Sequence, residues 1–551
     1  MKTTPSRSKL MARVRHGGTA PELAVRRLLK LFRIPFKTSG KGLPGTPDVI
    51  NKGQKWAIFV HGCFWHRHRG CKLATTPKTN RAFWLKKFQQ NQERDRRKIA
   101  QLRALGYRVL VIWACQLDEP GRVARKLLKR LPRKPAGASP VSSRESYRLA
   151  ASGKRVVRIV RMDKRGTAVS WVTIPDGLVG DPGTLFDQAI LRRATRPTPS
   201  SSGEAVRVVD LFSGCGGLSL GAREACRAIG RPFEVVLAID ASRASFEVYR
   251  ENFHPTVAYT GDIQRILDGQ SGSRPTRKEE LLRKLLGRVD LLLAGPPCQG
   301  HSDLNNHTRR TDERNRLYER VGRFAEIVRP RSIVIENVRT IVHGKDGSLE
   351  QTKDLLLGLG YAVDAGIVDA SELGVPQIRR RHVLLASLEK RVTVGDVVSR
   401  HRVDTIRTVR WAIEDLSREH RNGILTRPTQ HNEQNRRRME FLAANRRLDL
   451  PNRLRPSCHR DGNHTYKSMY GRLSYDLPAG TITSGFGSPG QGRFIHPTQR
   501  RTLTPHEAAR LQFFPDWFKF SGVETRTALA EMIGNAVPMK LSYAFCLELL
   551  V

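Results

Sequence analysis

The stretch VRVVDLFSGCGG, residues 206–217, decides the fold of the C-terminal half of this chain. The apolar run at residues 206–212 predicts a buried strand, and the glycines after it lead into a helix-like segment at residues 218–229. Strand, glycine turn and helix form a nucleotide-binding arrangement, because glycines let backbone amides and a helix N-terminus approach a ligand closely. The glycine spacing is not that of dinucleotide-binding proteins, so the turn alone is weak evidence for any one ligand.

Two acidic residues follow the next predicted strands. Asp240 closes the apolar segment at residues 233–239, and Asp262 follows a third short strand. An acidic side chain at the carboxyl end of a strand can hold ribose hydroxyls, and Asp262 is placed to hold an adenine amino group. The pattern therefore favours a ligand that contains a nucleoside.

A nucleophile and an acid occur further along the chain. The stretch AGPPCQG, residues 294–300, carries Cys298, and Glu336 begins the later sequence ENV. A thiolate on a rigid Pro-Pro turn can add to carbon 6 of cytosine. A protonated carboxyl, or its hydrogen bond, at ring nitrogen N3 accepts the electron density. Carbon 5 is then nucleophilic enough to take a methyl group. A lone Pro-Cys in a loop is more often structural, so the prediction depends on the motifs occurring together.

From about Val206 to the C-terminus, these motifs resemble the DNA cytosine-5 methyltransferases. The resemblance covers nearly all of that half and rests on separated motifs in the family's order: DLFSGCGG, Asp240, GPPCQG, ENV, QIRRR at 377–381 and GNAVP at 534–538. It implies a Rossmann-like S-adenosylmethionine methyltransferase domain, with Cys298 as nucleophile and Glu336 at N3. Arg379 and Arg381 would clamp the flipped cytosine. The residues implied around S-adenosylmethionine are Phe212, Gly214, Gly216, Asp240, Asp262, Pro296 and Asn535.

The composition supports a nucleic-acid partner independently. The 551 residues include 97 Lys+Arg and 51 Asp+Glu, a formal charge of +46, which predicts strong attraction to double-stranded DNA without choosing a sequence. The length allows two or three domains. With no run of about 18 apolar residues and no signal peptide, we expect a cytoplasmic, nucleoid-associated prokaryotic protein. Eight cysteines over this length do not predict a disulfide framework.

A cysteine and histidine cluster lies in the N-terminal half, in HGCFWHRHRGC at residues 61–71. Its potential soft ligands are Cys63, His68 and Cys71, and Cys115 follows a predicted strand at residues 109–113. Two cysteines, a histidine and a third cysteine suit a tetrahedral zinc ion with no open position, which indicates a structural site. His61 and His66 are left for chemistry.

The surrounding order is typical of a small α/β nuclease. The sequence TAPE, residues 19–22, is a capping-box opening for a helix. Short strands are expected at 47–50 and 55–60, and a long helix at 80–105. Asp48 at the head of a strand can hold magnesium against a scissile phosphate, and a nearby histidine can activate water. For Glu22, a capping role and a catalytic role have about equal weight.

Residues from about Arg7 to Glu119 resemble the very-short-patch-repair (Vsr) endonucleases, which nick DNA beside thymine-guanine mismatches. The shared motifs are SRSKLMARVR, LPGTPDVI, FVHGCFWHRHRGC, FW, ERDRR and WAC. The resemblance implies a small mixed-sheet, restriction-endonuclease-like domain with structural zinc. Its implied magnesium ligands are Asp48 and the Val60 carbonyl, a position where some members have threonine. The other implied site residues are His61 and His66 near the phosphate, Glu22 and Asp95 in support, Cys63, His68, Cys71 and Cys115 on zinc, and the wedge aromatics Phe64, Trp65 and Trp84.

Four regions follow from these assignments: the nuclease at 1–120, a basic connector at 121–204, the methyltransferase catalytic domain at 205–387 and 472–551, and a target-recognition region at 388–471. The connector is expected to contain a helix at 122–131, a hairpin at 156–174 in a small accessory module, and a flexible stretch of roughly 60 residues spanning about 40 Å. The region at 388–471 is rich in base-reading side chains. Its Cys458, His459 and His464 favour DNA contacts or a structural role over a metal site.

The predicted function is a fused methylation and repair enzyme. Methylated cytosine deaminates to thymine, and a linked nicking enzyme would correct the resulting thymine-guanine mismatch. The predicted cofactors are S-adenosylmethionine, magnesium and structural zinc, and mismatch-repair or excision-repair proteins are further candidate partners. Two alternatives stay open: a fused restriction-modification protein that cuts unmethylated sites, and an N-terminal DNA-binding module without catalysis. Asp48, His61 and His66 speak against the last, because a pure binder needs none of them.

Overall fold

The computed structural model describes residues 18–38, 40, 42–77, 79–131, 147–162, 166–174, 178–199, 203–297, 317–344, 347–418, 423–460 and 468–551. The chain divides into two compact units, one formed by residues 1–139 with 441–451 and the other by residues 140–440 with 452–551. Across the described ranges, no helix combines the length and apolar character required to cross a lipid bilayer.

The first unit is built on a mixed sheet in the order β1-β2-β3-β4. Strands β3 and β4 are parallel and the other neighbouring pairs are antiparallel. The strands and helices of this unit are β1 Lys37–Thr38, β2 Val49–Asn51, β3 Trp56–His61, β4 Arg108–Trp113, α2 Ala20–Leu31, α3 Arg81–Ala104 and α4 Pro120–Arg130. The predicted strands and long helix are confirmed within a few residues. The helix expected in the connector is α4, which buries Val123 and Leu127 in this unit.

The second unit is built on a sheet in the order β10-β9-β8-β11-β12-β14-β13. Its first five strands are parallel, and β14 runs antiparallel to both of its neighbours. The strands are β8 Val206–Leu211, β9 Phe233–Asp240, β10 Val257–Thr260, β11 Leu291–Ala294, β12 Ser332–Val338, β13 Ala362–Asp369 and β14 Arg380–Ser387. Because β8, β11 and β12 are adjacent and parallel, their carboxyl ends meet at one edge, where ligands bind in open α/β sheets.

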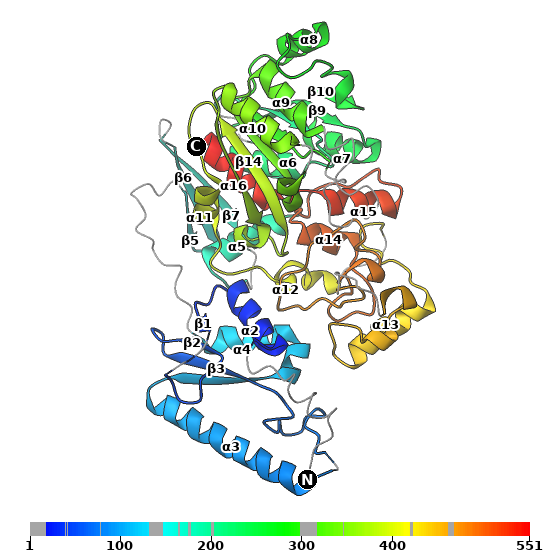
Figure 1. Ribbon diagram of the computed structural model, residues 1–551. Helices are drawn as coiled ribbons and strands as arrows, with labels where there is room; N and C mark the ends of the chain where they lie inside the picture. The colour runs from blue at the N-terminus through cyan, green and yellow to red at the C-terminus, as the bar shows by residue number, and fades with distance from the viewer. Residues whose placement is uncertain are drawn as a thin grey trace. The chain divides into compact units, whose positions relative to one another are not determined.

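Helices cover both faces of this sheet (Figure 1). Helices α6 and α16 share one apolar core with β8 and β11, whereas α8, α9 and α10 share another with β9 and β12. The helices of this layered part are α6 Gly217–Ala228, α7 Arg243–Phe253, α8 Arg277–Leu286, α9 Leu317–Val328, α10 Ser348–Gly358, α14 Pro505–Leu511, α15 Arg526–Asn535 and α16 Met539–Leu550. This is the mixed α/β, methyltransferase-like fold expected from the sequence.

Residues 147–191 form a small module that packs on the methyltransferase helices. Its antiparallel sheet has the order β5 Tyr147–Ser152, β6 Arg155–Met162 and β7 Gly166–Thr173, followed by α5 Pro182–Leu191. The predicted hairpin is therefore confirmed as β6 and β7. Arg158 of β6 is fully buried and donates to Glu224 of α6 at 2.7 Å and to Tyr543 of α16 at 3.2 Å. The expectation of a long flexible stretch is wrong for these residues, because apolar alternation and this ion pair fix them to the unit.

The region at 388–471 contains α11 Val394–His401, α12 Val409–Ile413 and α13 Glu433–Ala444. His459 lies in a short 3-10 turn. His464 and the side chain of Cys458 lie outside the described residues. That these residues contact DNA or are structural, and do not form a metal site, therefore stays a prediction.

Candidate functional site

The glycine turn after β8 is held between two other motifs. Phe212, Gly214 and Gly216 have φ of 59°, 53° and 100°, left-handed conformations that favour glycine. A Cβ on Gly216 would lie 2.2 Å from the Phe253 ring, and one on Gly217 would lie 2.3 Å from the Val537 carbonyl oxygen. Only glycine therefore lets the turn approach both α7 and the GNAVP segment this closely.

Acidic side chains shape this turn. The backbone N–H groups of Gly214 and Ser242 donate to the two carboxylate oxygens of Asp240, each at 2.7 Å. Burial raises the pKa of Asp240. Asp262 is exposed and caps a short helical turn by accepting from the Gln264 N–H at 3.0 Å. Asn535 is exposed at the end of α15. Whether these groups touch S-adenosylmethionine stays a prediction.

Sequence reasoning missed Asp210, the fully buried carboxylate at the end of β8. The Ser219 hydroxyl donates to it at 2.6 Å and is itself 2.7 Å from the Tyr249 hydroxyl. Burial raises the pKa of Asp210 to about 7. An acidic residue inside an apolar strand run was the only sequence feature that pointed to this network, which links β8, α6 and α7 behind the turn.

The segment that leads to Cys298 starts at the same sheet edge. Gly295 donates its N–H to the Leu211 carbonyl at 3.2 Å, and the Asn337 side chain donates to the Pro296 carbonyl at 3.3 Å. The DLF, PPC and ENV motifs are thus joined by hydrogen bonds. Cys298 itself lies outside the described residues.

Glu336 and Arg381 form an ion pair at this edge. Glu336 lies on β12, and Arg381 on β14 is paired in register with Val338, so the Arg381 Nε reaches Glu336 Oε1 at 2.9 Å. Burial raises the pKa of the Glu336 carboxyl, although the charges of Arg381 and Arg379 act in the opposite direction. A buried acid with a raised pKa is suited to donating a hydrogen bond to a ring nitrogen.

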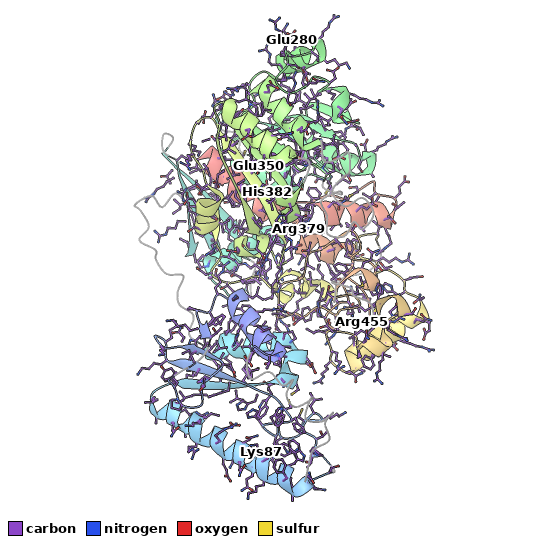
Figure 2. The ribbon with its side chains drawn as sticks, viewed as in Figure 1. Lys87, Glu280, Glu350, Arg379, His382 and Arg455 are labelled. Carbon is purple, nitrogen blue, oxygen red and sulfur yellow. The ribbon has the colours of Figure 1, made fainter. Side chains whose placement is uncertain are left out.

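Arg379 has a different environment. It is buried and donates to the Ile482 carbonyl at 2.9 Å and to the Gly534 and Ala536 carbonyls at 3.2 Å each. It lies just before β14, below His382 in the view of Figure 2. Its guanidinium therefore ties the start of β14 to the GNAVP segment, and direct contact of Arg379 with cytosine stays a prediction.

In the first unit, Asp48 lies at the start of β2 and faces β3. Its carboxylate accepts the Val60 N–H at 2.7 Å. Burial raises the pKa of Asp48, and the nearby Glu22 carboxylate acts in the same direction. Two adjacent acids, one of them partly buried, favour a bound cation, because a cation relieves both the burial and the repulsion.

Glu22 has the geometry of a capping residue. Its carboxylate accepts the Gly18 N–H and the Thr19 hydroxyl, each at 2.9 Å, and pairs with Arg26 at 3.2 Å. The Thr19 hydroxyl in turn accepts the Glu22 N–H at 3.4 Å. The capping contacts predicted from the sequence are present at the start of α2, and a catalytic role for Glu22 is untested.

His61, His66 and Asp95 form one cluster. The two imidazoles stack with centroids 3.9 Å apart and planes 9° apart, and His66 Nδ1 lies 2.5 Å from Asp95 Oδ2. Burial, with the neighbouring His66, lowers the pKa of His61 to about 4. Asp95 therefore orients the His66 ring through Nδ1, and the other ring nitrogen, Nε2, takes no part in this contact.

The predicted zinc ligands converge as well. One potential ligand atom from each of Cys63, His68, Cys71 and Cys115 lies within 4.8 Å of all the others. His68 Nδ1 is 3.8 Å from the Cys63 sulfur and 3.2 Å from the Cys115 sulfur, and its ring stacks on Trp113 at 4.3 Å. Three thiols and an imidazole so close together fit a tetrahedral zinc ion.

The predicted wedge aromatics form one cluster. Phe64 lies 5.2 Å from Trp65 and 5.5 Å from Trp84, and the two indoles are 5.9 Å apart, centroid to centroid. Phe83, which the sequence reasoning did not assign to the wedge, stacks edge-on against Trp84 and is 62% exposed. An exposed aromatic beside an aromatic cluster is available to contact bases.

The methyltransferase-like sheet, its glycine turn and the Glu336–Arg381 pair define a protein of the α/β methyltransferase class. The family model of the C-5 cytosine-specific DNA methylases matches residues 206–550, and the chain belongs to this family. The model of the DNA mismatch endonuclease Vsr matches residues 1–72. The N-terminal part thus carries a Vsr-like endonuclease domain.

Similar proteins fall into the same two groups. The chain is 45% identical over 364 residues to the Type II methyltransferase M1.BsuMI of Bacillus subtilis, covering 66% of this chain and 85% of that protein. It is 43% identical over 125 residues to the Type II nicking enzyme V.XorIIP of Xanthomonas oryzae, covering 22% and 91%. It is 43% identical over 112 residues to the DNA mismatch endonuclease Vsr of Escherichia coli, covering 20% and 71%.

Proposed function

We propose that this cytosine-5 DNA methyltransferase methylates cytosine in a specific DNA sequence and that its N-terminal domain nicks DNA at the thymine-guanine mismatches that arise when the product deaminates. The observation that carries the proposal is the presence in one chain of two separately clustered sites. One is the Glu336–Arg381 pair at the methyltransferase sheet edge, and the other is Asp48 with the His61, His66 and Asp95 cluster.

Methylation requires a nucleophile and an acid. The Cys298 thiolate adds to carbon 6 of the flipped base while protonated Glu336 holds N3, so electron density reaches carbon 5. Carbon 5 takes the methyl group, and loss of its proton then expels the thiolate. S-adenosylmethionine, held by the glycine turn and the residues around Asp240, supplies that methyl group when bound. Arg381 fixes the Glu336 carboxylate oxygen, and Arg379 ties the start of β14, the strand that carries Arg381, to the GNAVP segment.

Nicking requires a charged centre and a base. Asp48 and the Val60 carbonyl would hold magnesium, which stabilises charge on the scissile phosphate when bound. His66, oriented by Asp95, is suited to take a proton from the attacking water, and the aromatic cluster of Phe64, Trp65 and Trp84 would replace base stacking lost at the mismatch. Zinc on Cys63, His68, Cys71 and Cys115 would be structural, because no ligand position is left open.

Relatives support a nicking reaction over double-strand cleavage. One relative of the N-terminal part is named a nicking enzyme and another a mismatch endonuclease. A methyltransferase creates the substrate for mismatch repair, since 5-methylcytosine deaminates to thymine. Linking the two domains keeps them at high effective concentration on one DNA segment.

Two variants test whether the activities are separate. Cys298→Ala is expected to abolish methylation and trapping on 5-fluorocytosine DNA, while S-adenosylmethionine binding stays within about a few-fold of normal and nicking is retained. Asp48→Ala is expected to eliminate magnesium-dependent nicking and spare methylation. Methylation by the Cys298→Ala protein would overturn the first mechanism, and full nicking by the Asp48→Ala protein would overturn the second.

A further inference from the structure

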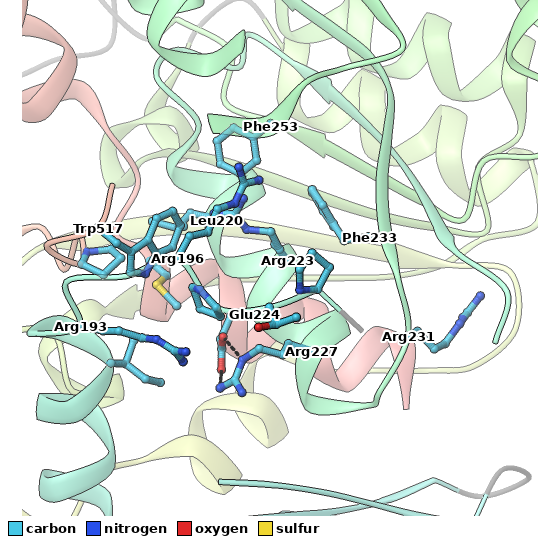
Figure 3. A pocket seen from close by; sticks show the side chains of 16 residues that line it. Arg193, Arg196, Leu220, Arg223, Glu224, Arg227, Arg231, Phe233, Phe253 and Trp517 are labelled. Atoms are coloured by element: carbon cyan, nitrogen blue, oxygen red, sulfur yellow. Dashed lines mark hydrogen bonds and ion pairs between the residues drawn. The ribbon is translucent and has the colours of Figure 1, made fainter. Parts of the chain in front are cut away.

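A pocket in the second unit lies away from the carboxyl edge of the sheet. It is bounded by α6, by the segment at residues 193–199 and by the loop around Trp517 (Figure 3). Phe233, at the start of β9, lines it, whereas Asp240 ends the same strand. At about 3.3 Å per residue, these two positions are roughly 23 Å apart along β9. The Phe233 side of the pocket is therefore distinct from the predicted S-adenosylmethionine site, and only Phe253 is shared, because its ring also packs against Gly216 of the glycine turn.

The pocket combines apolar walls with a strongly positive lining. The rings of Phe233, Phe253 and Trp517 form its walls together with aliphatic side chains, and its charged lining residues are Arg193, Arg196, Arg223, Glu224, Arg227 and Arg231. The lining thus carries five arginines and one carboxylate. Figure 3 shows Arg193 and Arg227 reaching toward Glu224, whereas Arg231 lies to one side.

The Glu224 carboxylate, the acid of this pocket, already has arginine partners. Glu224 Oε1 accepts from Arg158 at 2.7 Å and from Arg227 at 2.6 Å, and its Oε2 accepts from Arg227 Nε at 2.8 Å. The Arg193 guanidinium has no hydrogen bond or ion pair to any residue that the structure describes, and only its backbone N–H is engaged, by the Ile190 carbonyl at 3.4 Å. The pocket therefore keeps an excess of positive charge that its own acid does not neutralise.

Among the lining residues, Arg223 has the guanidinium whose surroundings most favour a bound anion. Its guanidinium lies between the rings of Phe253 and Trp517, 4.7 Å from each centroid, and Nη1 donates to the Asn252 carbonyl at 3.0 Å. Its Nη2 is buried and has no hydrogen-bond partner within the described part of the chain. Burial, with the nearby Arg196 charge, lowers the pKa of Arg223 to about 9. An unpaired buried donor of this kind is costly unless a ligand pairs with it.

We propose that this pocket, with a cavity volume of about 100 Å³, takes the phosphate groups of a nucleotide-type polyphosphate on its arginines, with the base at the pocket mouth against the half-buried Trp517. Guanidinium groups pair with phosphate oxygens in strong, directional hydrogen bonds, and aromatic rings stack on bases. A DNA duplex presents phosphates on a broad rod, which can meet the rim but not the apolar walls. Arg193 and Arg196 lie outside both matched family-model segments, 1–72 and 206–550, so the family models do not by themselves imply this site.

Calorimetric titration of the full-length protein tests the proposal. The protein is saturated with S-adenosylhomocysteine, so that adenosine groups cannot enter the methyltransferase site, and is titrated with ATP, inorganic tripolyphosphate and adenosine. One equivalent of ATP is expected to bind, more tightly than tripolyphosphate and far more tightly than adenosine. The double variant Arg193→Glu, Arg196→Glu should weaken ATP binding at least about tenfold, because two charge-assisted contacts become repulsive.

Two further variants separate this site from general attraction to a basic protein. Arg277→Glu, at an exposed arginine of α8, makes half of that charge change elsewhere and should leave ATP affinity unchanged. Trp517→Leu should remove the preference for ATP over tripolyphosphate. Non-saturable binding, an equal loss in Arg277→Glu, or unchanged affinity in the Arg193, Arg196 double variant would overturn the proposal. In another outcome, a DNA duplex displaces ATP and its own affinity falls equally in that double variant. That result would overturn the proposal as well, because the surface would then belong to the DNA interface.

Discussion

At the residue scale, Glu336 determines how methylation should depend on pH. Burial raises the pKa of its carboxyl, so the proton is kept at pH values above the ordinary range of glutamate and is lost as pH rises through the raised pKa. Only the protonated carboxyl donates to N3. Single-turnover methylation by the wild type, divided by that of Glu336→Gln at each pH, is therefore expected to fall as pH rises, because the amide donates without titrating.

This ratio cancels the ionisation of Cys298, which both proteins share. At low pH the wild type should exceed Glu336→Gln by about 10²- to 10⁴-fold, the usual contribution of a positioned acid. A ratio that stays constant from roughly pH 5 to pH 9, a range that brackets ordinary and raised carboxyl pKa values, would contradict the assignment of Glu336 as a proton donor.

The sequence predicted which residues lie close together better than it predicted the contacts that each residue makes. Motif order was enough to place Glu336 and Arg381 at one sheet edge, because neighbouring strands bring their ends together. It could not show that the Arg379 guanidinium would be engaged by three backbone carbonyls, since that depends on how residues 482 and 534–536 fold against β14. Asp210 and Asn337 were missed for the same reason: their partners lie on other elements.

At the element scale, the end of α15 must contain glycine. A Cβ on Gly534 would lie 2.2 Å from the Ser484 nitrogen and 2.4 Å from the Thr483 carbonyl carbon. Gly534→Ala is therefore expected to destabilise the second unit by about 1–3 kcal/mol through overpacking and to reduce methylation while nicking is retained. Chemical denaturation and both activity assays measure these effects.

Gly358→Ala is the matched control for this change. Gly358 ends α10, and a Cβ there would meet nothing within 4 Å. Alanine at this position should be neutral or stabilising by up to about 1 kcal/mol, because it favours helix more than glycine does. Equal stability losses in the two variants would mean that the tight contact of Gly534 with residues 483–484 has no special role.

The cysteine and histidine cluster makes a prediction for the first unit. Cys71→Ser is expected to release zinc and to lower the thermal transition of this unit strongly, because binding of a structural zinc ion contributes directly to folding, by about 10–16 kcal/mol in small zinc-binding peptides. Elemental analysis and calorimetry of the full-length protein test this, with Lys72→Ser, at an exposed neighbour, as control. A zinc-free wild type with a normal transition would contradict the site.

Elements with strong periodicity were predicted well, and the module at residues 147–191 only in part. The hairpin was visible as alternation, but its docking was not. Arg158, at a position where a charge normally indicates solvent, is instead buried against Glu224 and Tyr543. Such an ion pair joins residues far apart in the sequence, so a local pattern carries no trace of it.

At the scale of the whole molecule, one chain carries two candidate sites from families that act on DNA, and a charge of +46 favours DNA binding. Charge cannot decide between a repair pair and a restriction-modification pair, because both require DNA. What decides is the base pair at which the first unit cuts. Extruding a base costs a few kcal/mol and is easier at a mismatch, which gives mismatch preference a physical cause.

The most direct test of the central claim therefore compares nicking on three duplexes that contain the sequence this methyltransferase itself modifies, identified by bisulfite sequencing. One duplex has a thymine-guanine mismatch at the methylated cytosine position, one is fully paired and unmethylated, and one is fully paired and methylated. We expect magnesium-dependent nicking to be fastest on the mismatched duplex and Trp65→Ala to erode this preference. Efficient cleavage of the paired, unmethylated duplex that methylation blocks would contradict it and establish a restriction-modification protein.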